Sequence, residues 1–169
     1  AYPKIAQGDA ETILRFRPTL VLFSDYSRAE LVEQVRRAGV PVLVFDHYRT
    51  IEDAFANLRR LAAALADAAA KDRAEAVIAD CRTRLADLHR RLQGTRPVRV
   101  IAPSTYGIIA GAETTFQDIC DFAGAENLAS TLGHLVGHSA PPNEAMLQWP
   151  VEYVVLGGNS ADEAIEPYL

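Results

Sequence analysis

Short continuous apolar runs alternate with amphipathic segments along the first part of the chain. The runs at residues 20–23 and 40–45 are bounded by Pro, Gly and acidic residues, and such continuous hydrophobicity is typical of strands that a parallel sheet covers on both faces. A helix capped by Asp9 precedes the first run, and a helix over 28–38, capped by Ser27, separates the two. Strand, helix and strand in this order predict a right-handed βαβ unit.

Helical periodicity continues from Thr50 to about Gln93 with hardly a break. Apolar side chains recur every three to four residues along two successive stripes, and the middle of the segment, residues 62–70, is rich in alanine. A joint between two helices is one interpretation of Lys71-Asp72, which follows the alanine-rich part. A helix of roughly forty residues is long for a globular domain, so the segment predicts a spacer between two parts of the molecule.

The alternation of strands and helices resumes near Val98. The expected elements are strands at 98–102 and 108–110, a helix from Thr114 or Thr115 to Ala123, a loop over 126–142, a helix from Asn143 to Gln148, a strand at 151–156 and a small helix after Ser160.

Two segments on either side of the long helical stretch share one pattern. Residues 9–23 (DAETILRFRPTLVLF) and 143–156 (NEAMLQWPVEYVVL) both place a polar cap, a glutamate, an apolar residue, a proline and a buried strand in that order. Two similar α/β lobes joined by a helical spacer explain this repetition. The general helix–proline–strand pattern of α/β proteins explains it as well.

Length and composition agree with an ordinary globular chain. The 169 residues suffice for one domain or two small lobes, and 49% apolar with 23% charged residues exclude a disordered or collagen-like chain. With 17 basic against 22 acidic residues, the net charge of −5 argues against a nucleic-acid partner. The apolar runs are too short to span a bilayer.

The sequence motifs of common enzyme classes do not occur in the chain. It has no phosphate-binding glycine loop, nucleophile elbow or HExxH zinc motif, so no reaction can be proposed from its motifs. Two cysteines exclude a disulfide scaffold and CxxC metal sites. Cys81 and Cys120 fall on apolar helix faces, where a small buried side chain is the default interpretation.

Five segments, spread over nearly the whole chain, have the order and spacing of a known family. They are GDAETILRFRPTLVLFSD, AELVEQVRRAGVPVLVFD, NLRRLAAAL, TTFQDICDFAGAENLAS and NEAMLQWPVEYVVLGG. On these segments the chain resembles the substrate-binding proteins of bacterial ABC importers for ferric siderophores, cobalamin and related chelates.

The resemblance implies an α/β fold of two Rossmann-like lobes with mainly parallel sheets, joined by one long, rigid helix. It divides the chain into an N-terminal lobe at 1–49, a linking backbone helix at 50–94 and a C-terminal lobe at 95–169. Family members have a further strand and helix before the segment that begins here at Tyr2, and several more elements after the strand at 151–156. We therefore expect both lobes to be incomplete, and their uncovered sheet edges to favour self-association.

Glu11 and Glu144 are the expected contacts to a membrane permease. Each lies in the first turn of its predicted helix, where the helix dipole alone favours a carboxylate. In the family that the chain resembles, the matching glutamate of each lobe docks with arginines of the permease. Carboxylate–arginine pairs are often bidentate and fix register, so the chemistry suits a two-point docking surface.

Three tyrosines are expected to contact the ligand. Tyr26 and Tyr106 follow strand ends, where α/β sheets bind ligands, and Tyr48 follows the second strand in the sequence Asp46-His47-Tyr48. The flat face and phenol of tyrosine suit a macrocycle or a catecholate chelate. Local packing of each ring, and a helix-capping role for Asp46, explain the same pattern.

One histidine completes the expected ligand contacts. His138 lies six residues before Glu144, a position that the resemblance places in the ligand cleft. His134 and His138 have the spacing of a helical metal site, but the surrounding glycines and prolines predict a loop. We therefore expect His138 to contact the ligand, and we assign no metal site.

The resemblance as a whole implies an exported binding protein with no catalytic residues and no cofactor of its own. It would be periplasmic or lipid-anchored, capture a metal chelate between its lobes and deliver the chelate to ABC permease subunits. A ferric siderophore is the first expectation, and cobalamin or haem comes next. A fragment of an α/β enzyme, or a cytoplasmic domain that reuses the same lobes, is the alternative.

Overall fold

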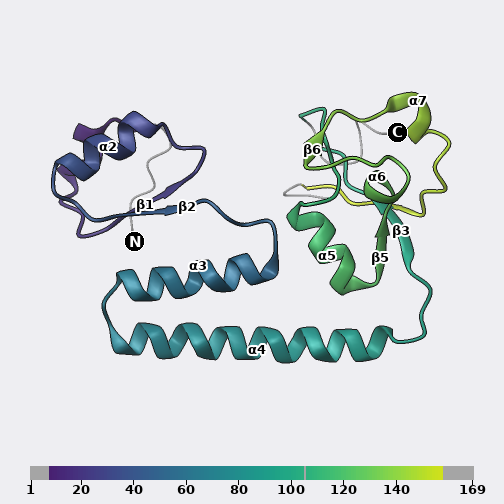
Figure 1. Cartoon of the computed structure of the whole chain (residues 1–169), viewed down its shortest axis with the longest axis horizontal. Coiled ribbons are helices and arrows are strands. Elements are labelled where there is room, and N and C mark those ends of the chain that lie inside the picture. Colours follow the sequence, from purple (N-terminus) through teal and green to yellow (C-terminus); the bar gives the residue numbers. More distant parts are fainter. Residues whose placement is uncertain (1–7, 105, 158–169) are drawn as a thin grey trace. The chain divides into compact units, whose positions relative to one another are not determined.

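The computed structural model describes residues 8–104 and 106–157 and has an α/β architecture with mainly parallel sheets (Figure 1). Its elements are, in chain order, α1 (Ala10–Arg15), β1 (Val21–Ser24), α2 (Ala29–Arg37), β2 (Val42–Phe45), α3 (Ile51–Ala64), α4 (Ala68–Leu92), β3 (Val98–Ile101), β4 (Ile109–Ala110), α5 (Thr115–Ala123), β5 (Ala125–Asn127), α6 (Leu128–Thr131), β6 (His138–Ser139), α7 (Asn143–Met146) and β7 (Tyr153–Val154). The predicted fold class is confirmed. The small helix expected after Ser160 lies outside the described residues.

The chain divides into two compact units. The first unit comprises Ala1–Tyr48 and Asp53–Val77, and the second comprises Arg49–Glu52 and Ile78–Leu169. The boundary passes through both α3 and α4, so the predicted division into two lobes and a separate linking helix stays a prediction. No helix in the described part of the chain is long and apolar enough to cross a membrane.

The first unit is built around the predicted βαβ arrangement. Strands β1 and β2 are parallel, with Val21 opposite Val42 and Ser24 opposite Phe45. Because the two strands end in register, the loops that follow them begin side by side. Apolar side chains from α1, β1 and α2 form the core of this unit: Ile13, Phe23, Val32 and Val35.

One face of β1 is more open than its sequence predicts. Phe23 points into the core, whereas Leu22 is 48% exposed and lines a groove of about 1510 Å³ together with Phe16, Leu61 and Leu65. The expectation that both faces of this strand are covered is therefore wrong for the described residues. Self-association stays a prediction, and this groove is the apolar surface of the first unit to which it applies.

Of the two helix caps predicted in the first unit, Asp9 is confirmed and Ser27 is wrong. The Asp9 carboxylate accepts a hydrogen bond from the backbone N–H of Thr12 at 2.7 Å, as expected of an N-cap. Ser27 does not cap α2: the cap position is Arg28, and no side chain caps the helix there. The Ser27 backbone N–H donates instead to the Ser24 carbonyl, which closes the turn after β1.

The helical stretch from Thr50 to Gln93 consists of two helices, as one interpretation of the sequence allowed, but the joint lies at Ala66-Asp67. Helix α3 ends before Ala66, whose φ of 53° is left-handed, and α4 begins directly after Asp67. The Asp67 carboxylate accepts a hydrogen bond from the backbone N–H of Ala69 at 3.1 Å. This bond caps the N-terminus of α4, so a new helix begins within the alanine-rich segment. Lys71-Asp72, the expected joint, lies inside α4. Helix α4, with 25 residues, is the long helix of the fold.

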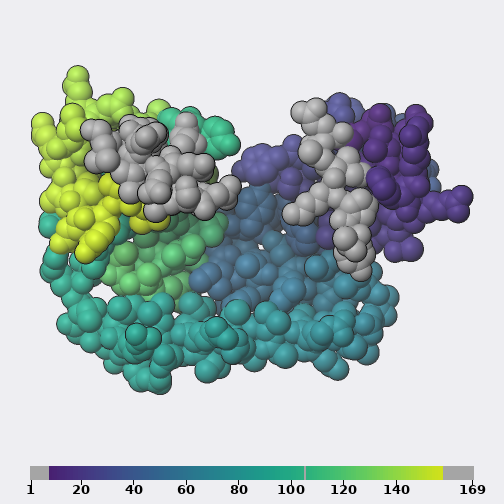
Figure 2. Space-filling view, turned by 180° about the vertical axis from the view of Figure 1, so that it is seen from behind, coloured from purple at the N-terminus to yellow at the C-terminus, as the bar shows by residue number. Residues whose placement is uncertain are grey.

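Helices α3 and α4 pack against each other within the first unit. Small side chains, Ala62, Ala70 and Ala74, form their buried contact and allow close approach of the two backbones. Arg59 and Glu75 add a bidentate ion pair, with N···O distances of 2.7 and 2.9 Å. In the space-filling view the residues of α4 form one continuous band in blue and teal (Figure 2).

The second unit contains a parallel sheet in the order β5-β3-β7 and a small antiparallel pair, β4 and β6. The expected helix α5 is present, with Thr114 as its cap and the left-handed Gly124 at its end. The expected loop over 126–142 is wrong in part, because it contains the end of β5, α6 and β6. Buried Asn127 links two of these elements. Its amide donates to the Ala110 carbonyl of β4 at 3.0 Å, and its side-chain oxygen caps α6.

Both copies of the repeated sequence pattern form a short helix followed by a parallel strand. Residues 9–23 give α1 and β1, and residues 143–156 give α7 and β7. The second copy is weaker, since α7 has no side-chain cap and β7 is only two residues long.

The side chain of Glu152 ties β3 to the chain that leads into β7. Its carboxylate accepts hydrogen bonds from the Arg96 guanidinium and, at 2.9 Å, from the backbone N–H of Arg99. The Arg96 bond and then the Arg99 backbone bond are the largest causes that lower the pKa of Glu152 to about 2. The backbone N–H of Glu152 also donates to the Arg99 carbonyl, so charge and backbone pairing reinforce one another.

Replacing Glu152 by glutamine should destabilise the second unit at neutral pH but have less effect in acid. The folded pKa of about 2 lies below the ordinary value of 4.5, so the carboxylate stabilises the fold fully above about pH 4.5 and loses this contribution as the pH falls towards 2. Urea unfolding of the parent and of Glu152→Gln at pH 7 and pH 3 measures the difference, with exposed Glu144→Gln as the control. An equal difference at both pH values would contradict the role of the charge.

Candidate functional site

The carboxyl ends of β1 and β2 bring five polar or aromatic residues into two neighbouring loops. Asp25 and Tyr26 follow β1, and Asp46, His47 and Tyr48 follow β2. The backbone N–H of Asp25 donates to the carbonyl of Phe45 at 3.0 Å, which holds the two loops together where they begin. This edge of a parallel sheet is where α/β proteins bind ligands.

Two of the predicted tyrosines form an aromatic pair. The ring centroids of Tyr26 and Tyr48 lie 6.2 Å apart with the planes tilted by 44°. The Tyr48 hydroxyl donates a hydrogen bond to the Asp25 carboxylate, and this bond, followed by partial burial, raises the pKa of Tyr48. Tyr48 is thereby held as a protonated phenol, while the Tyr26 side chain is largely exposed.

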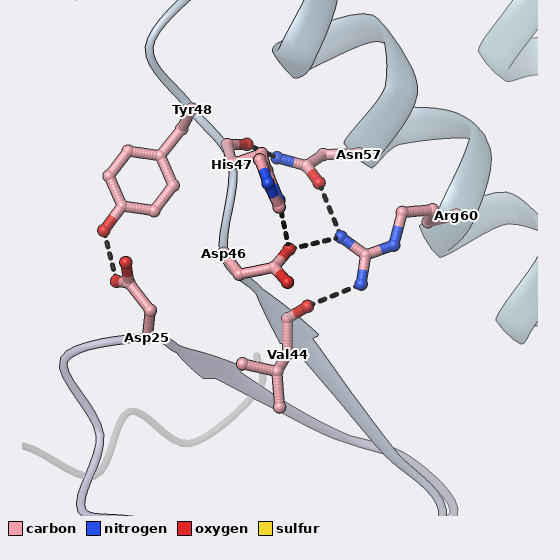
Figure 3. A network of polar contacts seen from close by, with 7 residues as sticks. All are labelled: Asp25, Val44, Asp46, His47, Tyr48, Asn57 and Arg60. Atoms are coloured by element: carbon pink, nitrogen blue, oxygen red, sulfur yellow. Dashed lines mark hydrogen bonds and ion pairs between the residues drawn. The ribbon is translucent and has the colours of Figure 1, made fainter. Parts of the chain in front are cut away.

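A second polar network holds the loop after β2 against α3 (Figure 3). The Asp46 carboxylate accepts from Nδ1 of His47 at 2.9 Å and from the Arg60 guanidinium at 3.0 Å. These two hydrogen bonds, that of His47 first, lower the pKa of Asp46. Asp46 does not cap the following helix, since the first N–H of α3, that of Ile51, donates to Asp118 instead.

Two side chains of α3 also bond to the backbone of this strand and loop. Arg60 donates to the Val44 carbonyl at 2.8 Å, and the Asn57 amide donates to the His47 carbonyl. Arg60 and Asn57 bond to each other at 3.1 Å. The sequence analysis did not identify either residue. The one sequence feature that could have done so is their spacing of three, which places both side chains on one face of the helix.

The other two predicted ligand contacts belong to the second unit. Tyr106 is exposed in the turn after β3, where its backbone N–H donates to the Ser104 hydroxyl at 3.2 Å. His138 is exposed in β6, opposite Ala110 of β4. His134 lies in the connection before β6 with a φ of 50°, so the expected absence of helical spacing between the two histidines is confirmed. The roles of Tyr106 and His138 in ligand binding stay predictions.

The two predicted docking glutamates occupy corresponding places in their helices. Glu11 lies in the first turn of α1 and pairs with Arg15 at 2.9 Å, with both side chains about three-quarters exposed. Glu144 lies in the first turn of α7 and is exposed. Both carboxylates are accessible from solvent, and their docking role stays a prediction.

The cysteines take no part in the polar loops. Cys120 is buried, and this burial, followed by the nearby charge of Asp121, raises the pKa of its thiol to about 11. Cys81 is half-buried on α4, and both thiols are free. Among the described residues no group of three or more His, Cys, Asp and Glu side chains is placed to hold a metal ion.

Solved structures with the same fold include periplasmic haem-binding proteins. One from Pseudomonas aeruginosa is 27% identical with a TM-score of 0.76, and the match covers 95% of this chain and 60% of that one. RhuT from Roseiflexus sp. RS-1, in its apo form, is 26% identical with a TM-score of 0.77, again over 95% and 60%. BhuT in complex with two haems is 24% identical with a TM-score of 0.75, over 94% and 59%.

The chain thus spans about 60% of the length of these structures. No curated protein sequence matches the chain closely enough to add to this comparison. The family model described as periplasmic binding protein matches residues 3–166. By this match over nearly its whole length, the chain belongs to the periplasmic binding protein family.

Proposed function

We propose that this chain belongs to the extracytoplasmic substrate-binding component of an ABC importer. Its first unit contacts the ligand, which is the iron porphyrin haem. The observation that carries the proposal is the Tyr26–Tyr48 pair at the carboxyl ends of β1 and β2. Tyrosine offers a large apolar face with little conformational entropy to lose, and a porphyrin presents a matching flat surface. Tyr48 is already oriented by Asp25, so part of the ordering needed for binding is present before the ligand arrives.

Two comparisons support haem over the siderophore and cobalamin expected first from the sequence. The Pseudomonas aeruginosa and Roseiflexus structures, both more than 25% identical, are of haem-binding proteins. The enzyme alternative gains no support, since the family and these neighbours are periplasmic binding proteins.

Titration with haemin, ferric siderophores and cobalamin, followed by absorbance and by tyrosine fluorescence, tests the proposal. Haemin should bind most tightly, and Tyr26→Ala and Tyr48→Ala should each weaken its binding roughly 2- to 10-fold, the range expected for one aromatic contact. Tyr153→Ala is the matched control, because Tyr153 is also exposed (65%) but lies on β7 of the second unit.

Two results would contradict the proposal. One is a parent chain that binds a siderophore or cobalamin more tightly than haemin. The other is haemin binding that the control variant weakens as much as the Tyr26 and Tyr48 variants do.

A further inference from the structure

His47 stands out among the histidines because its ring is oriented by a carboxylate. Nδ1 of His47 lies 2.9 Å from Oδ1 of Asp46, and the His47 side chain is 63% exposed. An ionised carboxylate can only accept a hydrogen bond, so Nδ1 must carry the proton. In the neutral imidazole the lone pair then resides on Nε2, the nitrogen that binds metals when Nδ1 is engaged in this way.

The partners of His47 are themselves fixed. Arg60 holds the Asp46 carboxylate at 3.0 Å and the Val44 carbonyl at 2.8 Å, so the group that orients the ring is tied to both α3 and β2 (Figure 3). Asn57 holds the backbone carbonyl of His47. A carboxylate behind a histidine, itself hydrogen-bonded, is the arrangement that sets ring orientation and raises ligand basicity in metal sites.

The neighbouring phenol is poorly suited to bind iron. Tyr48 donates its hydroxyl proton to the Asp25 carboxylate, which keeps the phenol protonated and occupies its oxygen. Of the three side chains that follow β2, Asp46 is bonded to His47 and Arg60, and Tyr48 is bonded to Asp25. His47 is the side chain of this loop that has a donor atom to offer.

We propose that Nε2 of His47 coordinates the iron of the bound porphyrin, with Asp46 as the residue that positions it. The inference rests on the proposed function. Nε2 gives its lone pair to the metal and replaces one bound water, while Nδ1 keeps its proton and its bond to Asp46. No oxidation or reduction accompanies the step.

Comparing haemin with metal-free protoporphyrin IX on the 169-residue chain separates ligation from stacking. His47→Ala should weaken haemin binding about 10-fold or more and change the absorption spectrum of the bound haemin, yet leave the affinity for metal-free protoporphyrin within about 2-fold. Asp46→Asn should shift haemin binding in the same direction by a smaller factor. His89→Ala is the matched control, since His89 is exposed on α4 and its ring makes no hydrogen bond to a carboxylate among the described contacts.

The outcomes are distinguishable. Equal weakening of both porphyrins in His47→Ala would mean that His47 contacts the macrocycle rather than the metal, and would overturn the inference alone. Unchanged haemin affinity and spectrum in His47→Ala would do the same. A parent chain that binds neither porphyrin would instead overturn the proposed function, and the inference with it. Unaltered binding of metal-free protoporphyrin also shows that His47→Ala is folded.

Discussion

Alanine at Gly111 should lower the unfolding free energy of the second unit by more than about 3 kcal/mol. A Cβ at this position would lie 2.3 Å from the carbonyl oxygen and 2.6 Å from the carbonyl carbon of Leu135, both of them backbone atoms. That carbonyl accepts from the N–H of Ala112 at 2.8 Å, and the N–H of Gly111 donates to Gly137 at 2.9 Å. These two hydrogen bonds join the segment at Gly111 to residues 135–137 on both sides of the contact. Neither segment can therefore move away without losing them.

Urea unfolding followed by circular dichroism measures the loss. Gly157→Ala is the matched control, since no atom of the described residues lies within 4 Å of its added Cβ and its backbone is not left-handed. We expect the control to unfold within about 0.5 kcal/mol of the parent, as surface substitutions usually do. Equal stability of Gly111→Ala and the control would show that β4 and the 135–137 segment do not approach as closely as described.

If Glu11 and Glu144 dock the chain to a permease, as we propose, reversing both charges should abolish uptake by the whole importer. Glu11→Lys with Glu144→Lys would present two lysines where two accessible carboxylates now begin α1 and α7. Like charges facing permease arginines oppose docking, whereas the exposed Glu11–Arg15 pair adds little to stability. Growth on haem as the iron source measures uptake, and haemin titration should stay within a few-fold of the parent.

A charge-matched double variant controls for the change in net charge. The control variant is Glu30→Lys with Asp80→Lys. Glu30 lies in the first turn of α2, and Asp80 pairs with Arg84 at i,i+4, as Glu11 pairs with Arg15. This variant should support uptake. Normal uptake by the Glu11 and Glu144 double variant would refute the docking role, and both residues would then be ordinary helix-start carboxylates.

Local chemistry made much of the fold predictable. Each strand of the first unit is a continuous apolar run between breakers, and Asp9, Thr114 and Gly124 start or end helices by bonds to their own neighbours. The βαβ unit and the parallel pairing follow from these short-range signals. Ser27 lies in the turn that closes after β1, one residue before the cap position of α2, so the sequence pattern misplaced this helix start by one residue.

Features set by contacts between distant residues were not predictable. In the alanine-rich segment every residue except Asp67 favours helix, so the break at Ala66 depends on the packing of α3 against α4 and on the Asp67 cap. The strands within the expected loop are too short to show periodicity, and each is held by pairing with a distant strand: β5 with β3, and β6 with β4.

The candidate site divides in the same way. Its tyrosines could be placed from strand ends alone, because the carboxyl edge of a parallel sheet follows from topology. Asp25, Asn57 and Arg60 could not, since each acts through a partner on another element. Their bonds orient the Tyr48 hydroxyl and the His47 ring, on which the proposed binding site depends.

Binding of an iron porphyrin at the Tyr26–Tyr48 pair is tested most directly by NMR of the chain with carbon-13-labelled tyrosine rings. Ferric haem is paramagnetic and broadens signals of nearby nuclei, so one equivalent of haemin should erase the ring signals of Tyr26 and Tyr48 and leave that of Tyr153, on β7, visible. Tyrosine-to-phenylalanine variants assign the signals, and a diamagnetic zinc porphyrin gives the reference spectrum. Ring signals of Tyr26 and Tyr48 that stay sharp with bound haemin would contradict the proposed site.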